Sequence, residues 1–194
     1  CRACERSSYE ETDDALFVRG VTSDEVLFGR KLTLAREIAL SKSEDSFTVT
    51  DVIANAGDTV QPFEILYHMN MGHPLLDEGS VLSIPSARVT PRDAHAGEDI
   101  EHWMRMEKPQ AGYRERCYYH WFDQNEGCAE IYQPKLGVGL RIAYDSKSLD
   151  SFVEWKMMGV RDYVLGLECG NCTPDGRDVM RAQGKLKFLS PGES

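Results

Sequence analysis

The chain has 194 residues, of which 41% are hydrophobic and 28% are charged, a composition typical of a globular domain with a sizeable core. Its formal net charge of −10 argues against nucleic acid or an anionic membrane as a partner. No apolar run approaches a membrane span and no signal peptide is visible, so we expect a cytoplasmic protein with no membrane partner. We expect one domain over residues 1–194, in which residues 1–14 form an irregular, polar lead-in.

After this lead-in, apolar and polar residues alternate with a period of two, which indicates β-strands. Strands are expected over residues 16–21, 26–28, 32–41, 47–54, 60–71, 113–122, 128–134, 137–144, 152–158 and 163–168. Turns are expected over 22–24, 43–45, 55–58, 123–127 and 159–162, and short helical segments over 100–106 and 177–183. Because strands follow one another with little helix between them, the pattern predicts an antiparallel all-β sandwich or barrel.

One carboxylate stands where the strand over residues 163–168 meets a run of turn residues. Glu168 ends this apolar strand, so its side chain is expected at the rim of a core. Partial desolvation there would raise its pKa and make it a better general base. A solvated glutamate at a strand end is the alternative interpretation.

The six cysteines include two Cys-x-x-Cys pairs, which is the ligand spacing of many zinc sites. Most of the chain separates the two pairs, and the compact knuckle that usually accompanies them is missing. We therefore expect reduced thiols and no metal. Gly137-x-Gly139 lacks the strand-to-helix setting of a dinucleotide loop, so we expect no nucleotide cofactor either. The cysteines are Cys1, Cys4, Cys117, Cys128, Cys169 and Cys172.

Several strings resemble aldose 1-epimerases, also called galactose mutarotases. Leu167-Glu168 followed by Pro174-Asp175 resembles the Leu-Glu…Pro-Asp signature of that family, and residues 189–193 resemble the Leu-x-Pro-Gly-Glu string that follows it. Residues 47–55 and 62–68 resemble the strand pair that ends in the family's catalytic-acid histidine. Residues 67–79 and Trp155-Lys156 are most similar to a bacterial branch of the superfamily known as a domain of unknown function.

This resemblance implies a galactose mutarotase-like β-sandwich (a supersandwich) that lacks its N-terminal strands, because the match begins near residue 16 and corresponds to the C-terminal two-thirds of a mutarotase. It further implies that Glu168 is the catalytic base and His68 the catalytic acid. We expect the two groups to face each other across a gap wide enough for a sugar ring.

Other candidate substrate-binding residues follow from their position beside this pair. Asn70 shares a strand face with His68 by period two, and Trp103 could stack on a sugar. Mutarotases carry a substrate-binding aspartate on the strand that corresponds to residues 113–122, where this chain has none. His120 is our substitute for it.

The register of the last hairpin decides between two further candidates. If Met158 pairs with Tyr163, Trp155 lies opposite Gly166 and shares a face with Glu168. A slip of one residue would present Lys156 instead, and the sequence leaves both open.

The function implied by the resemblance is isomerase activity that interconverts the anomers of a free sugar or sugar derivative. The alternatives are a carbohydrate-binding β-sandwich without turnover and another sugar epimerase or isomerase on the same scaffold. The expected partners are a small-molecule sugar and an N-terminal segment of the same protein. The oligomeric state is left open.

Overall fold

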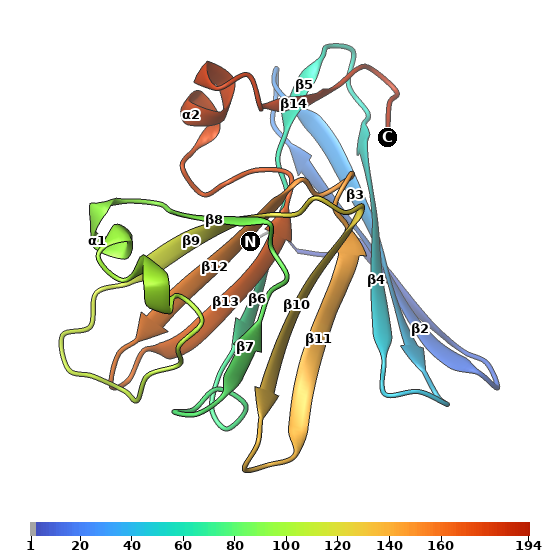
Figure 1. Ribbon diagram of the computed structural model, residues 1–194. Helices are drawn as coiled ribbons and strands as arrows, with labels where there is room; N and C mark the ends of the chain where they lie inside the picture. The colour runs from blue at the N-terminus through green and yellow to red at the C-terminus, as the bar shows by residue number, and fades with distance from the viewer. Residues whose placement is uncertain (1–2) are drawn as a thin grey trace. The chain divides into compact units, whose positions relative to one another are not determined.

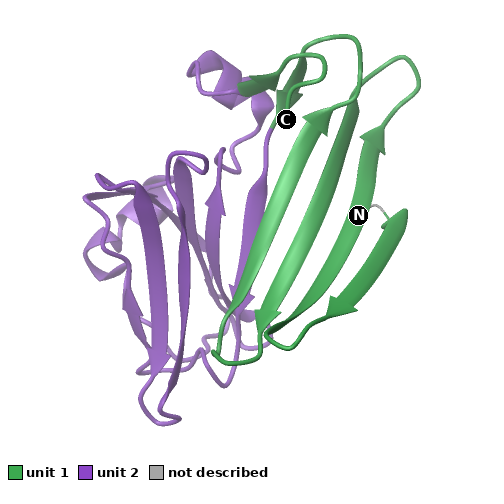
Figure 2. Ribbon diagram, turned by 90° about the vertical axis from the view of Figure 1, so that its right-hand side faces the viewer, with its two compact units in different colours: residues 1–63, 187–194 green, residues 64–186 purple. Residues whose placement is uncertain are grey.

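The computed structural model describes residues 3–194, and antiparallel β-strands make up most of its regular structure (Figure 1). The all-β class expected from the period of two is therefore confirmed. The chain forms two compact units, which Figure 2 colours separately: residues 1–63 with 187–194, and residues 64–186. Cys1, which we expect to be a reduced thiol, lies outside the described residues.

The first unit contains a four-stranded antiparallel sheet in the order β1-β2-β3-β4 and a two-stranded sheet of β5 and β14. Asn55 is fully buried where β4 ends, and its Nδ2 donates hydrogen bonds to the carbonyl oxygens of Thr59, at 2.8 Å, and Leu189, at 3.0 Å. This side chain therefore ties the C-terminal segment to the end of the sheet. The strands are β1 (Arg6–Glu11), β2 (Ala15–Glu25), β3 (Lys31–Ser41), β4 (Phe47–Asn55), β5 (Gln61–Phe63) and β14 (Lys187–Leu189).

Three expectations for this unit are wrong. The lead-in is not irregular throughout, because Arg6–Glu11 form the edge strand β1. All six residues are exposed, so the strand buries no face and its sequence does not have to alternate between apolar and polar residues. Glu10 accepts a hydrogen bond from Arg19 of β2 at 2.8 Å. The second error is the turn expected over residues 22–24, which instead continue β2 in register with β3. The third is the strand expected over residues 26–28, where the chain instead turns after β2 and Phe28 adopts a positive φ of 57°.

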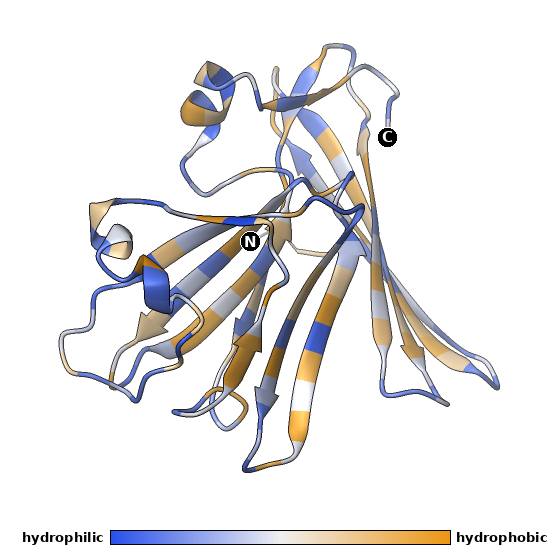
Figure 3. Cartoon of the chain, in the orientation of Figure 1, coloured by the Kyte–Doolittle hydropathy of each residue, from blue (hydrophilic) through white to orange (hydrophobic). Residues whose placement is uncertain are grey.

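The second unit packs a five-stranded sheet, in the order β6-β13-β12-β9-β8, against a three-stranded sheet, in the order β11-β10-β7. Their facing side chains form one apolar core, which includes Leu167, Phe152 and Ile131. Figure 3 shows the alternation of hydrophilic and hydrophobic residues along these strands. The strands are β6 (Leu66–Met71), β7 (Val81–Ser83), β8 (Arg88–Pro91), β9 (Arg116–Trp121), β10 (Glu126–Gln133), β11 (Val138–Asp145), β12 (Ser151–Met158) and β13 (Tyr163–Gly170).

The single strand expected over residues 60–71 is divided into β5 and β6, which belong to different sheets. The connections of this unit agree with the sequence except at residues 123–127. A hairpin turn is expected there, but β9 and β10 belong to different sheets, so the segment crosses between layers. The expected helix over 177–183 is confirmed as α2 (Arg177–Ala182). The segment over 100–106 contains only a 3-10 turn, η1 (Ile100–His102), and α1 (Ala94–Gly97) precedes it unpredicted, capped by Asp93.

Candidate acid–base site

One face of the five-stranded sheet points away from the apolar core and carries the candidate acid and base. The β12–β13 hairpin has the register that places Met158 opposite Tyr163 and Trp155 opposite Gly166. Paired residues in an antiparallel sheet point to the same side, so Trp155 joins Glu168 on this face. The sequence left this register open, and the structure selects it.

Glu168 is a buried carboxylate on this face. It lies on β13 opposite His68 of β6 on one side and Val153 of β12 on the other, and only 2% of it is exposed. Burial raises the pKa of Glu168, because a desolvated carboxylate favours its neutral form, and the charge of His68 opposes this shift. The side chain is therefore a stronger proton acceptor than a solvated glutamate.

His68 contacts this carboxylate directly. Its Nε2 lies 3.0 Å from Oε1 of Glu168, and 47% of its side chain is exposed. The two atoms are at ion-pair distance but are not aligned as a hydrogen bond, so Oε1 has no hydrogen-bond donor among the described residues. The expected sugar-wide gap is therefore absent: opposed residues on adjacent strands have Cβ atoms only about 5 Å apart.

Gly166 leaves the space that the carboxylate occupies. A Cβ atom at this position would lie 2.4 Å from Oε1 of Glu168 and 3.3 Å from Cβ of Trp155. Because the β13 residue between them is a glycine, Trp155 of β12 reaches His68 of β6. Their ring centroids are 5.5 Å apart at an interplanar angle of 71°. Asn70 also lies opposite Gly166 on this face and is exposed.

The indole of Trp155 is held from its other side. Its Nε1 donates a hydrogen bond to Oε2 of Glu115 at 2.7 Å. Oε1 of Glu115 accepts a hydrogen bond from Arg92 at 2.8 Å. The hydrogen bonds from Arg92 and then Trp155 hold the pKa of Glu115 below its usual range, so the carboxylate remains charged.

A third carboxylate, after Glu168 and Glu115, lies toward the other end of the same face. The hydroxyl of Tyr119, on β9 opposite Val153, donates to Oδ1 of Asp175 at 2.8 Å. Thr173 donates to the other carboxylate oxygen at 2.8 Å. Burial raises the pKa of Tyr119, which keeps the phenol protonated as a donor. These bonds fix the turn that follows β13.

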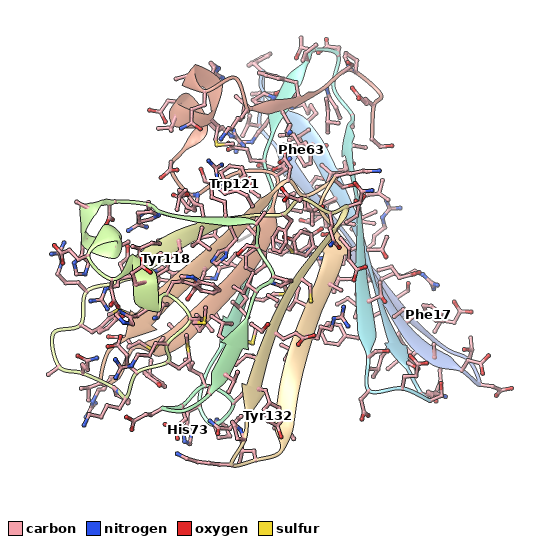
Figure 4. All side chains as sticks on the ribbon, viewed as in Figure 1. Phe17, Phe63, His73, Tyr118, Trp121 and Tyr132 are labelled. Atoms are coloured by element: carbon pink, nitrogen blue, oxygen red, sulfur yellow. The ribbon has the colours of Figure 1, made fainter. Side chains whose placement is uncertain are left out.

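The remaining candidates lie on the opposite, core-facing side of the sheet. His120 is buried, with Nε2 3.2 Å from Oε2 of Glu154 and Nδ1 3.1 Å from the hydroxyl of Ser86. Trp103 packs edge-on against its ring with the centroids 4.9 Å apart. Tyr118, labelled in Figure 4 beside the short helices, belongs to this buried face and is fully inaccessible.

Lys156 also belongs to this second cluster. Its Nζ donates to the carbonyl oxygens of Trp103, at 3.0 Å, and Arg105, at 2.7 Å, and burial lowers its pKa. The structure thus brings Lys156, His120 and Trp103 together, but on the side of the sheet away from Glu168. Their contacts anchor the segment around residues 103–105 to the sheet.

Sequence reasoning missed the groups that fix the aromatic ring and the turn. Glu115 lies two residues before Cys117, which pairs with Trp155. Knowing the pairing of β9 with β12 would therefore have placed Glu115 on the same face as Trp155. Asp175 is part of the Pro-Asp string that carries the family resemblance. Across residues 3–194, no group of three or more histidine, cysteine or acidic side chains is arranged to hold a metal ion, and no helix is long and apolar enough to cross a membrane.

Solved structures share this fold. A protein from Klebsiella pneumoniae, provisionally described as an aldose 1-epimerase, matches 96% of this chain with a TM-score of 0.89 and 22% identity. The Slr1438 protein from Synechocystis sp. PCC 6803 matches 97% with a TM-score of 0.66 and 18% identity. A TPR-domain containing protein from Parabacteroides distasonis matches 97%, also with a TM-score of 0.66, at 16% identity. The fold is thus that of an aldose 1-epimerase-like β-sandwich.

The chain spans 50%, 61% and 32% of the lengths of these three proteins, respectively. No curated protein matches it in sequence. The family described as "Domain of unknown function (DUF4432)" matches residues 2–194, and the chain belongs to this family. The resemblance to a domain of unknown function with an aldose 1-epimerase-like fold is confirmed.

Proposed function

We propose that this protein is a mutarotase-like isomerase that interconverts the anomers of a free sugar or sugar derivative. The observation that carries the proposal is the buried carboxylate of Glu168, whose pKa is raised, in contact with the half-exposed imidazole of His68. One group is desolvated enough to accept a proton, and the other can reach both solvent and substrate. Such a pair is suited to general acid–base catalysis.

The reaction needs one proton acceptor and one proton donor. Glu168, in its ionised form, takes the proton from the C1 hydroxyl, while protonated His68 gives a proton to the ring oxygen. The bond between C1 and the ring oxygen breaks, and the open-chain aldehyde forms. Rotation about the C1–C2 bond exposes the other carbonyl face to the ring oxygen. Reclosure returns the proton of the hydroxyl to His68, and Glu168 protonates the new C1 oxygen.

The surroundings of the pair suit a sugar. Trp155 offers an aromatic ring for the apolar C–H face of a pyranose, and Asn70 offers an exposed amide on the same face. We place the sugar against Trp155, with His68 turned from its contact with Glu168 toward the ring oxygen. Because the imidazole is half exposed, it can form hydrogen bonds with water or substrate after this rotation.

A second candidate is a carbohydrate-binding protein without turnover. The observation that favours it is the direct contact of 3.0 Å between Nε2 of His68 and Oε1 of Glu168. If this ion pair persists when sugar is bound, neither group is free to move a proton of the substrate. The aromatic ring and the polar groups around it would still bind sugar.

One experiment separates the two candidates. The rate of anomeric exchange is measured by magnetisation-transfer NMR for a panel of free aldoses, and binding to the same panel is measured by calorimetry. Exchange well above the rate in buffer supports the isomerase. Binding without exchange supports the second candidate, and the absence of both would overturn each of them.

A further inference from the structure

Resting on the proposed function, we infer that Glu115 is a positioning residue: held by Arg92, it fixes the indole of Trp155 as the stacking surface for the apolar face of a pyranose beside the acid–base pair. The 2.7 Å hydrogen bond from Nε1 of Trp155 to Oε2 of Glu115 is the contact through which it acts. Glu115 acts through the indole and reaches neither Glu168 nor His68 in the structure.

The indole needs such a restraint because the sheet leaves it space. Gly166 lies opposite Trp155, so the residue of β13 that pairs with Trp155 has no side chain to hold this flank of the ring. The imidazole of His68 meets the ring on that side, with the centroids 5.5 Å apart. A rotation of the indole about its side-chain torsions would therefore alter both the surface offered to a sugar and the contact with the catalytic acid.

Glu115 is itself well anchored. Its second oxygen binds Arg92 at 2.8 Å, and the backbone N–H of Arg92 donates to the carbonyl oxygen of Cys117 at 2.9 Å. Cys117 is the residue of β9 that pairs with Trp155. The two ends of the Trp155–Glu115–Arg92 chain are thus tied to the same point of the sheet. The charge on Glu115 also makes the indole hydrogen bond a charge-assisted one.

The test compares Glu115→Ala and Glu115→Gln with Trp155→Phe and with the double variant Glu115→Ala/Trp155→Phe. The control is Glu101→Gln, which changes a carboxylate in η1, outside this network. Each variant is examined for anomeric exchange, for sugar binding by calorimetry, and for the indole N–H resonance of Trp155 in ¹⁵N NMR.

Glu115→Ala should raise KM for anomeric exchange roughly tenfold, as expected for a lost charged hydrogen bond, and change kcat less. It should also move the indole resonance. Glu115→Gln keeps an acceptor oxygen and should restore most of the affinity. Because Glu115 acts through the indole, the double variant should be no worse than Trp155→Phe alone.

An unchanged KM in Glu115→Ala, or effects of the two single variants that multiply in the double variant, would overturn this inference while leaving the proposed function in place. If the unmutated protein neither exchanges nor binds any sugar of the panel, the proposed function fails and this inference fails with it. A shift of the indole resonance without a change in KM would also count against it, since the ring would then be held for structure alone.

Discussion

Gly166→Ala should impair catalysis while leaving the fold intact. An added Cβ would lie 2.4 Å from Oε1 of Glu168, whereas an ordinary contact begins near 3.4 Å, so the carboxylate must move by about 1 Å. The displaced atom is the end of a flexible side chain, and Gly166 does not have a positive φ, so the fold can absorb the change. Stability should change by less than about 1 kcal/mol, partly because alanine restricts the unfolded chain.

A 1 Å displacement of a catalytic group costs roughly a hundredfold in rate, and we expect a loss of this size in anomeric exchange for Gly166→Ala. The assay pairs exchange NMR with chemical denaturation. Gly72→Ala is the matched control, because a Cβ at Gly72 meets no atom within 4 Å and exchange should be unaffected. Full exchange activity in Gly166→Ala, with the fold intact, would refute the view that the position of this carboxylate limits the rate.

Three further predictions concern stability. Glu168→Gln should raise the melting temperature at neutral pH, because burial raises the pKa of Glu168 and its charged form is disfavoured in the folded protein; calorimetry that shows a lower melting temperature would contradict this. Burial also raises the pKa of Glu154 above its ordinary value of 4.5, so its contribution to stability is fully present below that pH and is lost as the pH rises through the folded-state pKa. As the pH is raised, the free energy of unfolding of Glu154→Gln should therefore increase relative to that of the wild type, by at most about 1.4 kcal/mol per pH unit. A difference in unfolding free energy between the two proteins that stays constant with pH would exclude this titration. Tyr119→Phe should cost about 1 kcal/mol in urea denaturation, because it removes the hydrogen bond to Asp175, and a neutral result would show that this bond does not hold the turn.

The sequence predicts the class of the fold and most of the strands, because apolar and polar residues alternate wherever one face of a strand is buried. The β12–β13 hairpin shows this, since both strands and the turn over residues 159–162 were expected, although the sequence left open which of two registers pairs them. β1 shows no such alternation, because all of its residues are exposed. The turn expected over residues 22–24 fails for a related reason, since polar side chains are acceptable in a strand that is only half buried.

The candidate site was predictable in part. Glu168, His68, Asn70 and Trp155 lie on one face. Parity along one strand predicted that His68 and Asn70 share a face, whereas the register that places Trp155 beside Glu168 was one of two that the sequence left open. His120 lies on the other face, because its parity on β9 differs from that of Cys117 and Tyr119.

Which strands are neighbours could not be read from periodicity. The pairing of β6 with β13, which brings His68 into contact with Glu168, depends on the topology of the whole sheet. The restraint of Trp155 by Glu115 depends in the same way on the pairing of β9 with β12, and it too was missed.

The measurement that tests the central claim most directly is the rate of anomeric exchange in Glu168→Gln, His68→Asn and the double variant, with sugar binding measured beside it. Each single variant should lose on the order of a hundredfold to ten-thousandfold in rate, and binding should largely survive. The double variant should lose much less than the product of the single losses, because both groups serve one proton-transfer step. Full exchange activity in Glu168→Gln, or losses that multiply in the double variant, would contradict the account.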